Sequence, residues 1–413
     1  MISVCFYFEV HQPYRIKPYS FFQIGKDPFY LDDQKNYAVV RKVGDKCYLP
    51  TTRVLLDLIR KYGQEFKVTF SISGTAIEQF RHWYPEVLDQ FKRLADTGCV
   101  EFLSETYYHS LASLFSEKEF SRQVAQHKDL IRREFGIIPQ AFRNTELIYS
   151  NHIANLTKKM GYKLMLMEGA DKLLGWRSPN FLYKAKYEPE MKILLKNYKL
   201  SDDIAFRFSE KSWKEFPLSA DKFSNWVHSS AGNARVINLF MDFETFGEHQ
   251  WEASGIFDFL RHLPDHMNKH PDFHFRTVSE AANRSETVGD IDTHEPVSWA
   301  DTERDLSAWL GNSMQKQALE SIYELETKVY SFCDEDMLDI FGKLQTSDHF
   351  YYMCTKYFND GDVHKYFSPY NSPYDAYIYY MNVLQDFRQR LSSRKDYSYR
   401  VQPNQTISAK FVS

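Results

Sequence analysis

Short apolar segments alternate with amphipathic segments over residues 1–300 of the chain. The apolar segments have the length and the β-branched or aromatic content of buried strands: 2–10, 67–72, 100–103, 140–143, 163–167, 192–196, 236–241 and 273–275. Amphipathic runs such as Thr52–Tyr62 and Glu86–Thr97 predict helices between them, and Gly98 can cap the second run. This alternation predicts βα units and a parallel sheet, which closes or nearly closes into a barrel. A doubly wound sheet would give a similar pattern.

The pattern changes after Arg304. Apolar residues then recur every three or four positions, which predicts a helix with one apolar face: Met314, Ala318, Ile322, Leu325, Val329 and Phe332. Further helices are expected near 336–344 and 374–391. We therefore expect a barrel domain over 1–300, a helical domain over 301–395 and a polar tail over 396–413.

Composition excludes several classes of protein. With 43% hydrophobic and 26% charged residues and a net charge of -4, the chain has ample core and no basic surface for nucleic acid. No apolar run approaches the roughly 20 residues that span a bilayer. Neither a signal peptide nor a CxxC motif is present, so we expect a cytoplasmic protein with reduced thiols. The five cysteines are scattered: Cys5, Cys47, Cys99, Cys333 and Cys354.

Charged residues cluster where the predicted strands end. In a parallel barrel these carboxyl ends lie on one face, where α/β proteins place their chemistry. The residues concerned are Glu9, His11, Glu101, Glu105, His109, Arg143, Glu146, Asp242 and Glu244. Because an unpaired buried charge is costly, this concentration exceeds what stability requires and indicates an active site.

Two of these acids suggest a particular chemistry. Glu146 and Asp242 follow the fourth and seventh predicted strands, which lie across a barrel of seven or eight strands. A pair of carboxyl groups, one ionised and one protonated, is what a glycosidase uses to cleave a glycosidic bond. Taken singly, each acid is more often an ion-pair partner than a catalyst, and it is their convergence that favours catalysis. Aromatic residues make up 16% of the chain, and such rings can stack on sugars or fill cores.

The sequence resembles glycoside hydrolase family 57 in five ordered regions: His11-Gln12-Pro13, Glu101–His109, Phe142–Glu146, Met241–Gly247 and His274–Glu280. It is most similar to the α-amylase group, which also has stretches like 298–301, 308–312 and 345–348. The resemblance implies an incomplete seven-fold β/α barrel followed by a helical bundle. It further implies retaining hydrolysis of α-glucans such as maltooligosaccharides, without a metal or other cofactor.

The resemblance also implies roles for individual residues. Glu146 corresponds to the nucleophile and Asp242 to the acid/base, while His11 and His109 fall on sugar-contacting positions. Further candidates for subsite or supporting residues are Glu105, Arg143, Trp176, Glu244, Trp299, Trp309 and Asp348. Retention requires the two catalytic carboxyl groups to lie about 5 to 5.5 Å apart, whereas more than about 6.5 Å indicates inversion.

Other functions are compatible with the same residues. A 4-α-glucanotransferase would use the same glycosyl-enzyme, and a non-catalytic glucan-binding protein would differ by losing a carboxylate. His11, His109, Asp242 and Glu244 could instead hold a metal for polysaccharide deacetylation. Trp299 and Trp309 could be core residues, and the oligomeric state stays open.

Overall fold

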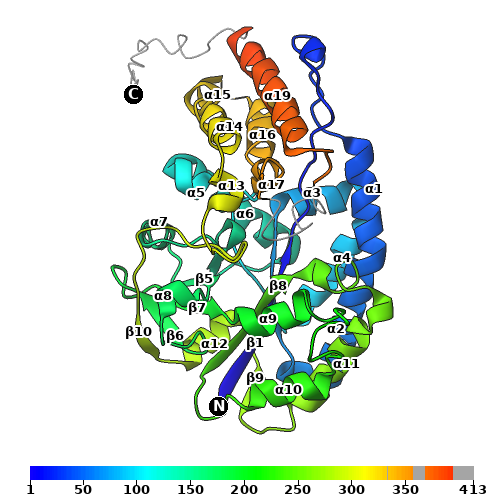
Figure 1. Ribbon diagram of the computed structural model, residues 1–413, viewed down its shortest axis with the longest axis vertical. Coiled ribbons are helices and arrows are strands. Elements are labelled where there is room, and N and C mark those ends of the chain that lie inside the picture. Colours follow the sequence, from blue (N-terminus) through cyan, green and yellow to red (C-terminus); the bar gives the residue numbers. More distant parts are fainter. Residues whose placement is uncertain (333, 357–367, 394–413) are drawn as a thin grey trace, which may run out of the picture.

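The computed structural model describes residues 1–332, 334–356 and 368–393 (Figure 1). Strand β1 (Ile2–Val10) lies at the centre of one sheet and is buried along its whole length. It pairs in parallel with β2 (Val68–Ile72), β8 (Val236–Asp242) and, through its first residues, β9 (Phe273–Phe275). Strand β3 (Val100–Phe102) extends this sheet beside β2, again in parallel.

A second sheet has the order β10-β6-β7-β5-β4. Its strands are β4 (Phe142–Arg143), β5 (Leu164–Glu168), β6 (Leu182–Ala185), β7 (Lys192–Lys196) and β10 (Thr287–Ile291). All its pairings are parallel except that of β6 with β7.

The two sheets adjoin at both sides. Ser104, just after β3, forms a parallel bridge to Phe142 of β4. At the other side, the Asn238 side chain of β8 donates to the Leu195 carbonyl of β7 at 2.8 Å. The backbone carbonyl of Asn238 accepts from the backbone amide of Asn197 at 2.9 Å. The strands therefore surround a common interior, which is consistent with a TIM-like barrel.

Helices cover the outside of the strands: α1 (Asp33–Val43), α2 (Leu49–Tyr62), α3 (Gly74–Trp83), α4 (Pro85–Asp96), α5 (Ala112–Phe115), α6 (Glu117–Phe135), α7 (Asn151–Lys159), α8 (Asp171–Leu174), α9 (Tyr198–Ala205), α10 (Ala220–His228), α11 (Ile256–Met267) and α12 (Val278–Arg284). The C-terminal helices stand together at one end of the molecule (Figure 1): α13 (Ser307–Leu310), α14 (Ser313–Tyr323), α15 (Glu326–Phe332), α16 (Glu335–Lys343), α17 (Ser347–Tyr351) and α19 (Pro373–Ser393). Among the residues that the structure describes, no helix is both long and apolar enough to cross a membrane.

The α/β architecture with a helical C-terminal region confirms the coarse prediction. Each predicted strand is present, with ends displaced by at most two residues. Strands β6 and β10 were not predicted, because Lys184 interrupts the apolar run of β6 and Gly289 and Asp290 interrupt that of β10. The single helix expected over 314–332 was wrong, since α14 ends at Tyr323 and α15 begins at Glu326.

The helical region shares its core with the second sheet. Phe142 and Met165 of the sheet belong to the same buried apolar cluster as Ile322 and Phe387 of the helices. The limits 300 and 395 stay predictions, and the polar tail and Cys333 lie outside the described residues. The remaining four cysteines are free and buried, as expected for reduced thiols.

One close contact joins α16 to the barrel and gives a stability prediction. A Cβ on Gly342 would lie 2.2 Å from a ring carbon of the buried Tyr108. We expect Gly342→Ala to lower the free energy of unfolding by about 1–3 kcal/mol, because the packed ring must move. Urea denaturation measures this change. Gly289→Ala is the control, since its Cβ would meet Tyr183 at an ordinary 3.9 Å; equal losses in both variants would contradict the prediction.

Candidate active site

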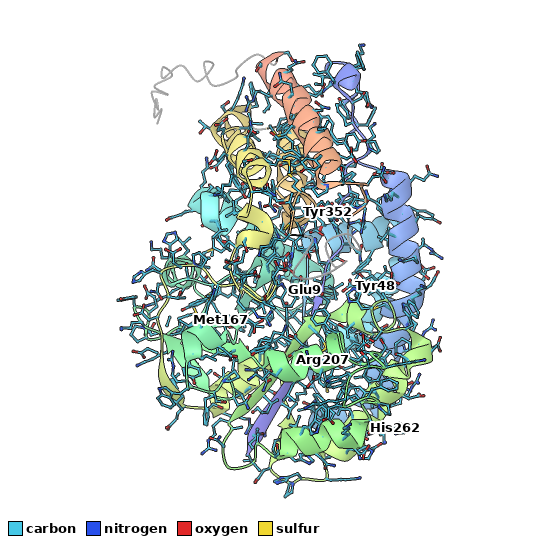
Figure 2. The ribbon with its side chains drawn as sticks, viewed as in Figure 1. Glu9, Tyr48, Met167, Arg207, His262 and Tyr352 are labelled. Carbon is cyan, nitrogen blue, oxygen red and sulfur yellow. The ribbon has the colours of Figure 1, made fainter. Side chains whose placement is uncertain are left out.

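A cavity of about 820 Å³ opens at the carboxyl ends of the central strands. Glu9 from β1, Lys196 from β7 and Asp242 from β8 line it. The helical region closes another side with Asp348 of α17 and with Tyr352 just after it. Figure 2 labels Glu9 of the barrel and Tyr352 of the helical region, and since both line the cavity, the site is built by both parts of the chain.

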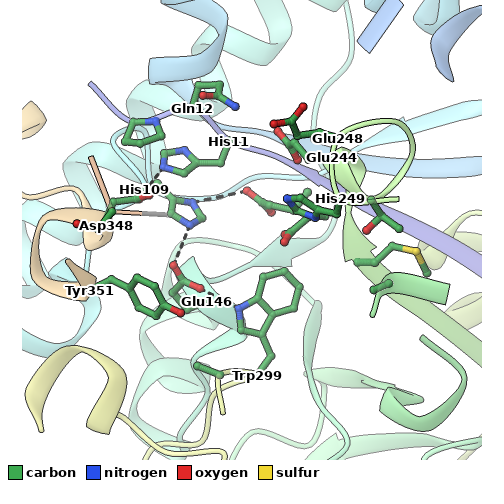
Figure 3. A pocket seen from close by; sticks show the side chains of 18 of the residues that line it. His11, Gln12, His109, Glu146, Glu244, Glu248, His249, Trp299, Asp348 and Tyr351 are labelled. Carbon is green, nitrogen blue, oxygen red and sulfur yellow. Dashed lines mark hydrogen bonds and ion pairs between the residues drawn. The ribbon is translucent and has the colours of Figure 1, made fainter. Parts of the chain in front are cut away.

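Glu146 is fixed in this cavity by three neighbours. The indole nitrogen of Trp299 donates to Oε2 at 2.8 Å, and the Ser347 hydroxyl donates to Oε1 at 3.0 Å. His109 Nε2 lies 3.4 Å from Oε1 (Figure 3). The backbone of Glu146 is left-handed, with φ of 57°, a conformation that costs of order 1–3 kcal/mol outside glycine. The surrounding contacts must therefore hold this carboxylate in place.

The same neighbours keep Glu146 ionised. Burial raises its pKa, but the hydrogen bond and charge of His109, with Arg143 and Trp299, outweigh burial and lower the pKa below its usual value. The pKa of His109 is raised to about 10, because its contacts with carboxylates outweigh the opposing effect of burial. Its Nδ1 lies 2.9 Å from Glu105 Oε2 and 3.6 Å from Glu9 Oε1. An imidazolium and a carboxylate thus face each other.

Asp242 has the opposite electrostatic character. Burial, followed by the charges of Glu9 and Glu146, raises its pKa to about 7, against the opposing charges of Arg143 and Lys196. Glu244 lies in the same wall, and burial together with the charge of Asp242 raises its pKa to about 8. The Tyr48 hydroxyl donates a hydrogen bond to Glu244 Oε1. Near neutral pH Glu146 is therefore ionised, whereas the raised pKa values of Asp242 and Glu244 favour their protonated forms.

Glu9 and Arg143 form a charged layer beside these groups. Arg143 Nε lies 3.2 Å from Glu9 Oε2, which also accepts hydrogen bonds from Tyr7 and Ser71 at 2.5 Å each. Arg143 is fully buried, and its guanidinium carbon lies 5.0 Å from the centre of the Trp299 ring. Arg143 and Glu105 do not line the cavity, so the structure places these two candidates behind its wall.

Most other candidates lie in the cavity wall. His11 Nδ1 lies 2.7 Å from Ser73 Oγ, its Nε2 lies 2.9 Å from Asp348 Oδ2, and its ring stacks on His109 at 4.0 Å. Burial raises the pKa of Asp348, but His11 outweighs burial and holds the pKa well below its usual range. Trp309 also lines the cavity although it is 1% exposed.

Trp176 is the one candidate that lies neither in the cavity wall nor directly behind it. Its side chain is 95% exposed, and it is not among the residues that line the cavity. The structure therefore does not bring Trp176 to the other candidate residues.

An ionic cluster of Glu168, Lys196, Asp202 and Arg304 was not predicted. Lys196 Nζ lies 3.1 Å from Asp202 Oδ1, and Arg304 lies 3.5 Å from Asp202 Oδ2 and 3.8 Å from Glu168 Oε2. Arg304 also donates to the Trp299 carbonyl at 2.5 Å. The strand-end pattern could have found Glu168 and Lys196, because they end β5 and β7 in register. Asp202 and Arg304 come from a helix and a loop, where no strand pattern applies.

Metal binding is a possible use of Glu9, Glu105 and His109. One ligand atom from each lies within 4.8 Å of the others. A histidine ligand must be neutral, however, and the pKa of His109 is raised to about 10. Both of its ring nitrogens also face carboxylates. These three residues therefore fit an internal ion pair better than a metal.

Comparison with known families identifies the class to which this α/β protein belongs. The model of glycosyl hydrolase family 57 matches residues 5–294, so the chain belongs to this family. A curated relative from Methanocaldococcus jannaschii, described as a "Putative alpha-amylase", is 46% identical over 399 residues, which cover 93% of this chain and 84% of the relative.

Two solved structures share the fold. The GH57 branching enzyme of Thermococcus kodakaraensis has a TM-score of 0.66 at 14% identity, covering 94% of this chain and 90% of the enzyme. The 4-alpha-glucanotransferase of Thermococcus litoralis has a TM-score of 0.64 at 16% identity, covering 84% of this chain. The match spans 56% of the glucanotransferase. At these identities the likeness concerns the fold alone.

The charges around Asp242 give a prediction for pH dependence. If activity needs an ionised Glu146 and a protonated Asp242, kcat/KM falls as pH rises through about 7. Lys196 lowers the pKa of Asp242, so Lys196→Met should move this alkaline limb to higher pH. Profiles of kcat/KM against pH measure the shift. Lys199→Met is the control, because Lys199 lies close by in the sequence, in α9, but is exposed. A limb that stays in place or moves to lower pH would contradict this assignment.

Proposed function

We propose that this protein is a retaining α-glucan hydrolase of the α-amylase type. It cleaves internal α-1,4-glucosidic bonds of starch, glycogen or maltooligosaccharides on an incomplete (β/α)7 barrel. Glu146 is the nucleophile and Asp242 is the acid/base. The observation that carries the proposal is the divergence of the two pKa values, because Glu146 is held below its usual value while Asp242 is raised to about 7.

The mechanism is a double displacement. Glu146 attacks the anomeric carbon while Asp242 donates its proton to the departing glycosidic oxygen. Asp242, now ionised, then removes a proton from the water that cleaves the glycosyl-enzyme, and each step inverts the anomeric carbon, so the overall result is retention. The donors Trp299 and Ser347 fix the attacking carboxylate in its orientation.

Substrate contacts follow from the cavity wall. His11, His109, Glu244 and Asp348 present polar groups to the hydroxyls of the sugar at the cleavage point, and Trp299 offers part of an aromatic face. Trp309 lines the cavity but is 1% exposed, so it supports the wall by packing rather than by stacking on a sugar.

Glucanotransfer is the second candidate, since the same glycosyl-enzyme can pass its sugar to another glucan instead of to water. It is favoured by the fold shared with the 4-alpha-glucanotransferase. The name of the 46% identical relative favours hydrolysis. Both proposed catalytic carboxylates are present, which disfavours a purely glucan-binding role.

Incubation with maltoheptaose separates these functions. An α-amylase gives shorter maltooligosaccharides and a rising number of reducing ends. A transferase gives both longer and shorter products at a constant number of reducing ends. Absence of any turnover of maltoheptaose, starch and glycogen would overturn both proposals, and release of acetate from an acetylated polysaccharide by the metal-loaded protein would favour deacetylation.

A further inference from the structure

The turn after α9 presents an exposed aromatic ring to the catalytic cavity. Phe206 lines the cavity, yet 64% of the residue is exposed. Its neighbours Ala205 and Phe208 are buried at 7% and 4% exposure. Phe208 packs on Phe259 with ring centres 5.3 Å apart, whereas the ring of Phe206 points out of this core. An exposed aromatic ring in the wall of a cavity is available to stack on a bound ligand.

The backbone around Phe206 is firmly held. Gln250, just beyond the segment of Asp242 and Glu244, donates to the Ala205 carbonyl at 2.8 Å. The amide of Phe206 donates to the Asp202 carbonyl at 2.9 Å. Helix α9 is bonded to strand β8, because the Phe240 amide of β8 donates to Ser201 Oγ of α9 at 3.2 Å. The position of the ring is therefore coupled to β8, which carries Asp242.

The charges near Phe206 define the chemistry of the ligand. Arg207, labelled in Figure 2, pairs with Asp203 at 2.6 Å and donates to the Lys199 carbonyl at 3.1 Å. Lys196 is paired with Asp202 at 3.1 Å. Because these two cations already have carboxylate partners, this part of the wall does not favour an anionic ligand. An aromatic face bordered by neutralised polar groups suits an uncharged sugar, whose C–H face stacks on a ring while its hydroxyls bind the polar groups.

The place of Phe206 also indicates which sugar it binds. The departing oxygen must lie within hydrogen-bond reach of Asp242 when the bond breaks. The leaving part of the glucan therefore lies on the side of the cavity formed by α9 and β8. Glu146 is held by Trp299 and Ser347 from other segments of the chain.

We propose that Phe206 is a stacking platform for a glucose residue on the leaving-group side of the cleaved bond, so that it also binds the acceptor in any transfer reaction. This inference rests on the proposed α-glucan activity and names one of its subsites. Phe206 acts by binding, so its loss should change affinity and product pattern while the chemical step is kept.

Binding is tested without turnover in the Glu146→Gln protein. Titration with maltoheptaose should show about tenfold weaker affinity after the additional change Phe206→Ala, and near-normal affinity after Phe206→Tyr, which keeps the ring. Trp176→Ala is the matched control, because it removes an exposed aromatic ring that does not line the cavity. Thermal midpoints of all variants should agree, since the ring of Phe206 is largely exposed.

Turnover is tested in the otherwise unchanged protein. Phe206→Ala should raise KM for maltoheptaose about tenfold, leave kcat within about twofold, and lower the ratio of transfer to hydrolysis products. Unchanged affinity and KM in Phe206→Ala, with normal cleavage by the unmodified protein, would overturn the platform and leave the proposed function intact. Failure of the unmodified protein to bind or cleave any α-glucan would overturn both.

Discussion

Glu146→Gln is expected to reduce kcat on maltoheptaose by on the order of 10⁴-fold or more, since no glycosyl-enzyme can form without the nucleophile. The amide keeps the volume of the side chain, and its one oxygen can still accept from either Trp299 or Ser347, so binding should survive. Initial rates of reducing-end release, with KM and a maltoheptaose titration alongside, measure the two effects separately.

The control for this change is Glu117→Gln, whose side chain is 61% exposed. It should turn over maltoheptaose at the normal rate. A second test uses Glu146→Ala with azide and an activated α-maltosyl substrate, because the small anion can enter the vacated space and attack in place of the carboxylate. A β-glycosyl azide is the expected product. Retention of more than about a tenth of kcat in Glu146→Gln would exclude this residue as the nucleophile.

Asp242→Asn is expected to lower kcat/KM on maltooligosaccharides by about 10²- to 10⁴-fold, the usual contribution of a general acid. The loss should be much smaller in the glycosylation step of a dinitrophenyl α-maltoside, because a dinitrophenolate departs without protonation. Burst kinetics with this substrate should show the glycosyl-enzyme accumulating, since the amide of the variant cannot activate water. The alkaline limb near pH 7 should also disappear from the pH profile.

Asp258→Asn is the control. Asp258 lies on α11, its side chain is 74% exposed, and among the described residues its ion-pair partner is Arg261. It should behave like the unmodified protein on both substrates. Equal losses on the natural and the activated substrate in Asp242→Asn would argue against the acid role. They would make Asp242 a binding or structural residue instead.

The strand pattern predicted where the charged residues gather, and the reason is geometric. Parallel strands bring their carboxyl ends to one face, so residues far apart in sequence, such as Glu9 and Asp242, meet once the strands pair. The ends of the predicted strands are visible in the chain because the apolar runs change abruptly to polar residues. The roles of Glu146 and Asp242 came from the resemblance to the family and stay predictions.

Other features of the site depend on contacts that no local pattern encodes. Trp299 donates to Glu146 from 153 positions along the chain, and Ser347 does so from 201 positions. The left-handed backbone of Glu146 is likewise imposed by its surroundings. Aromatic side chains illustrate the same limit, since Trp176 and Phe206 are both exposed but only Phe206 faces the cavity. Their exposure results from tertiary packing, whereas composition reports only that rings are abundant.

The anomeric configuration of the first product tests the central claim most directly. Proton NMR of a maltoheptaose digest, recorded before mutarotation is significant, distinguishes an α from a β reducing end. Double displacement through Glu146 predicts that the new reducing ends are α, followed by slow appearance of β. New reducing ends that are β at the earliest times would show direct attack by water and contradict the account.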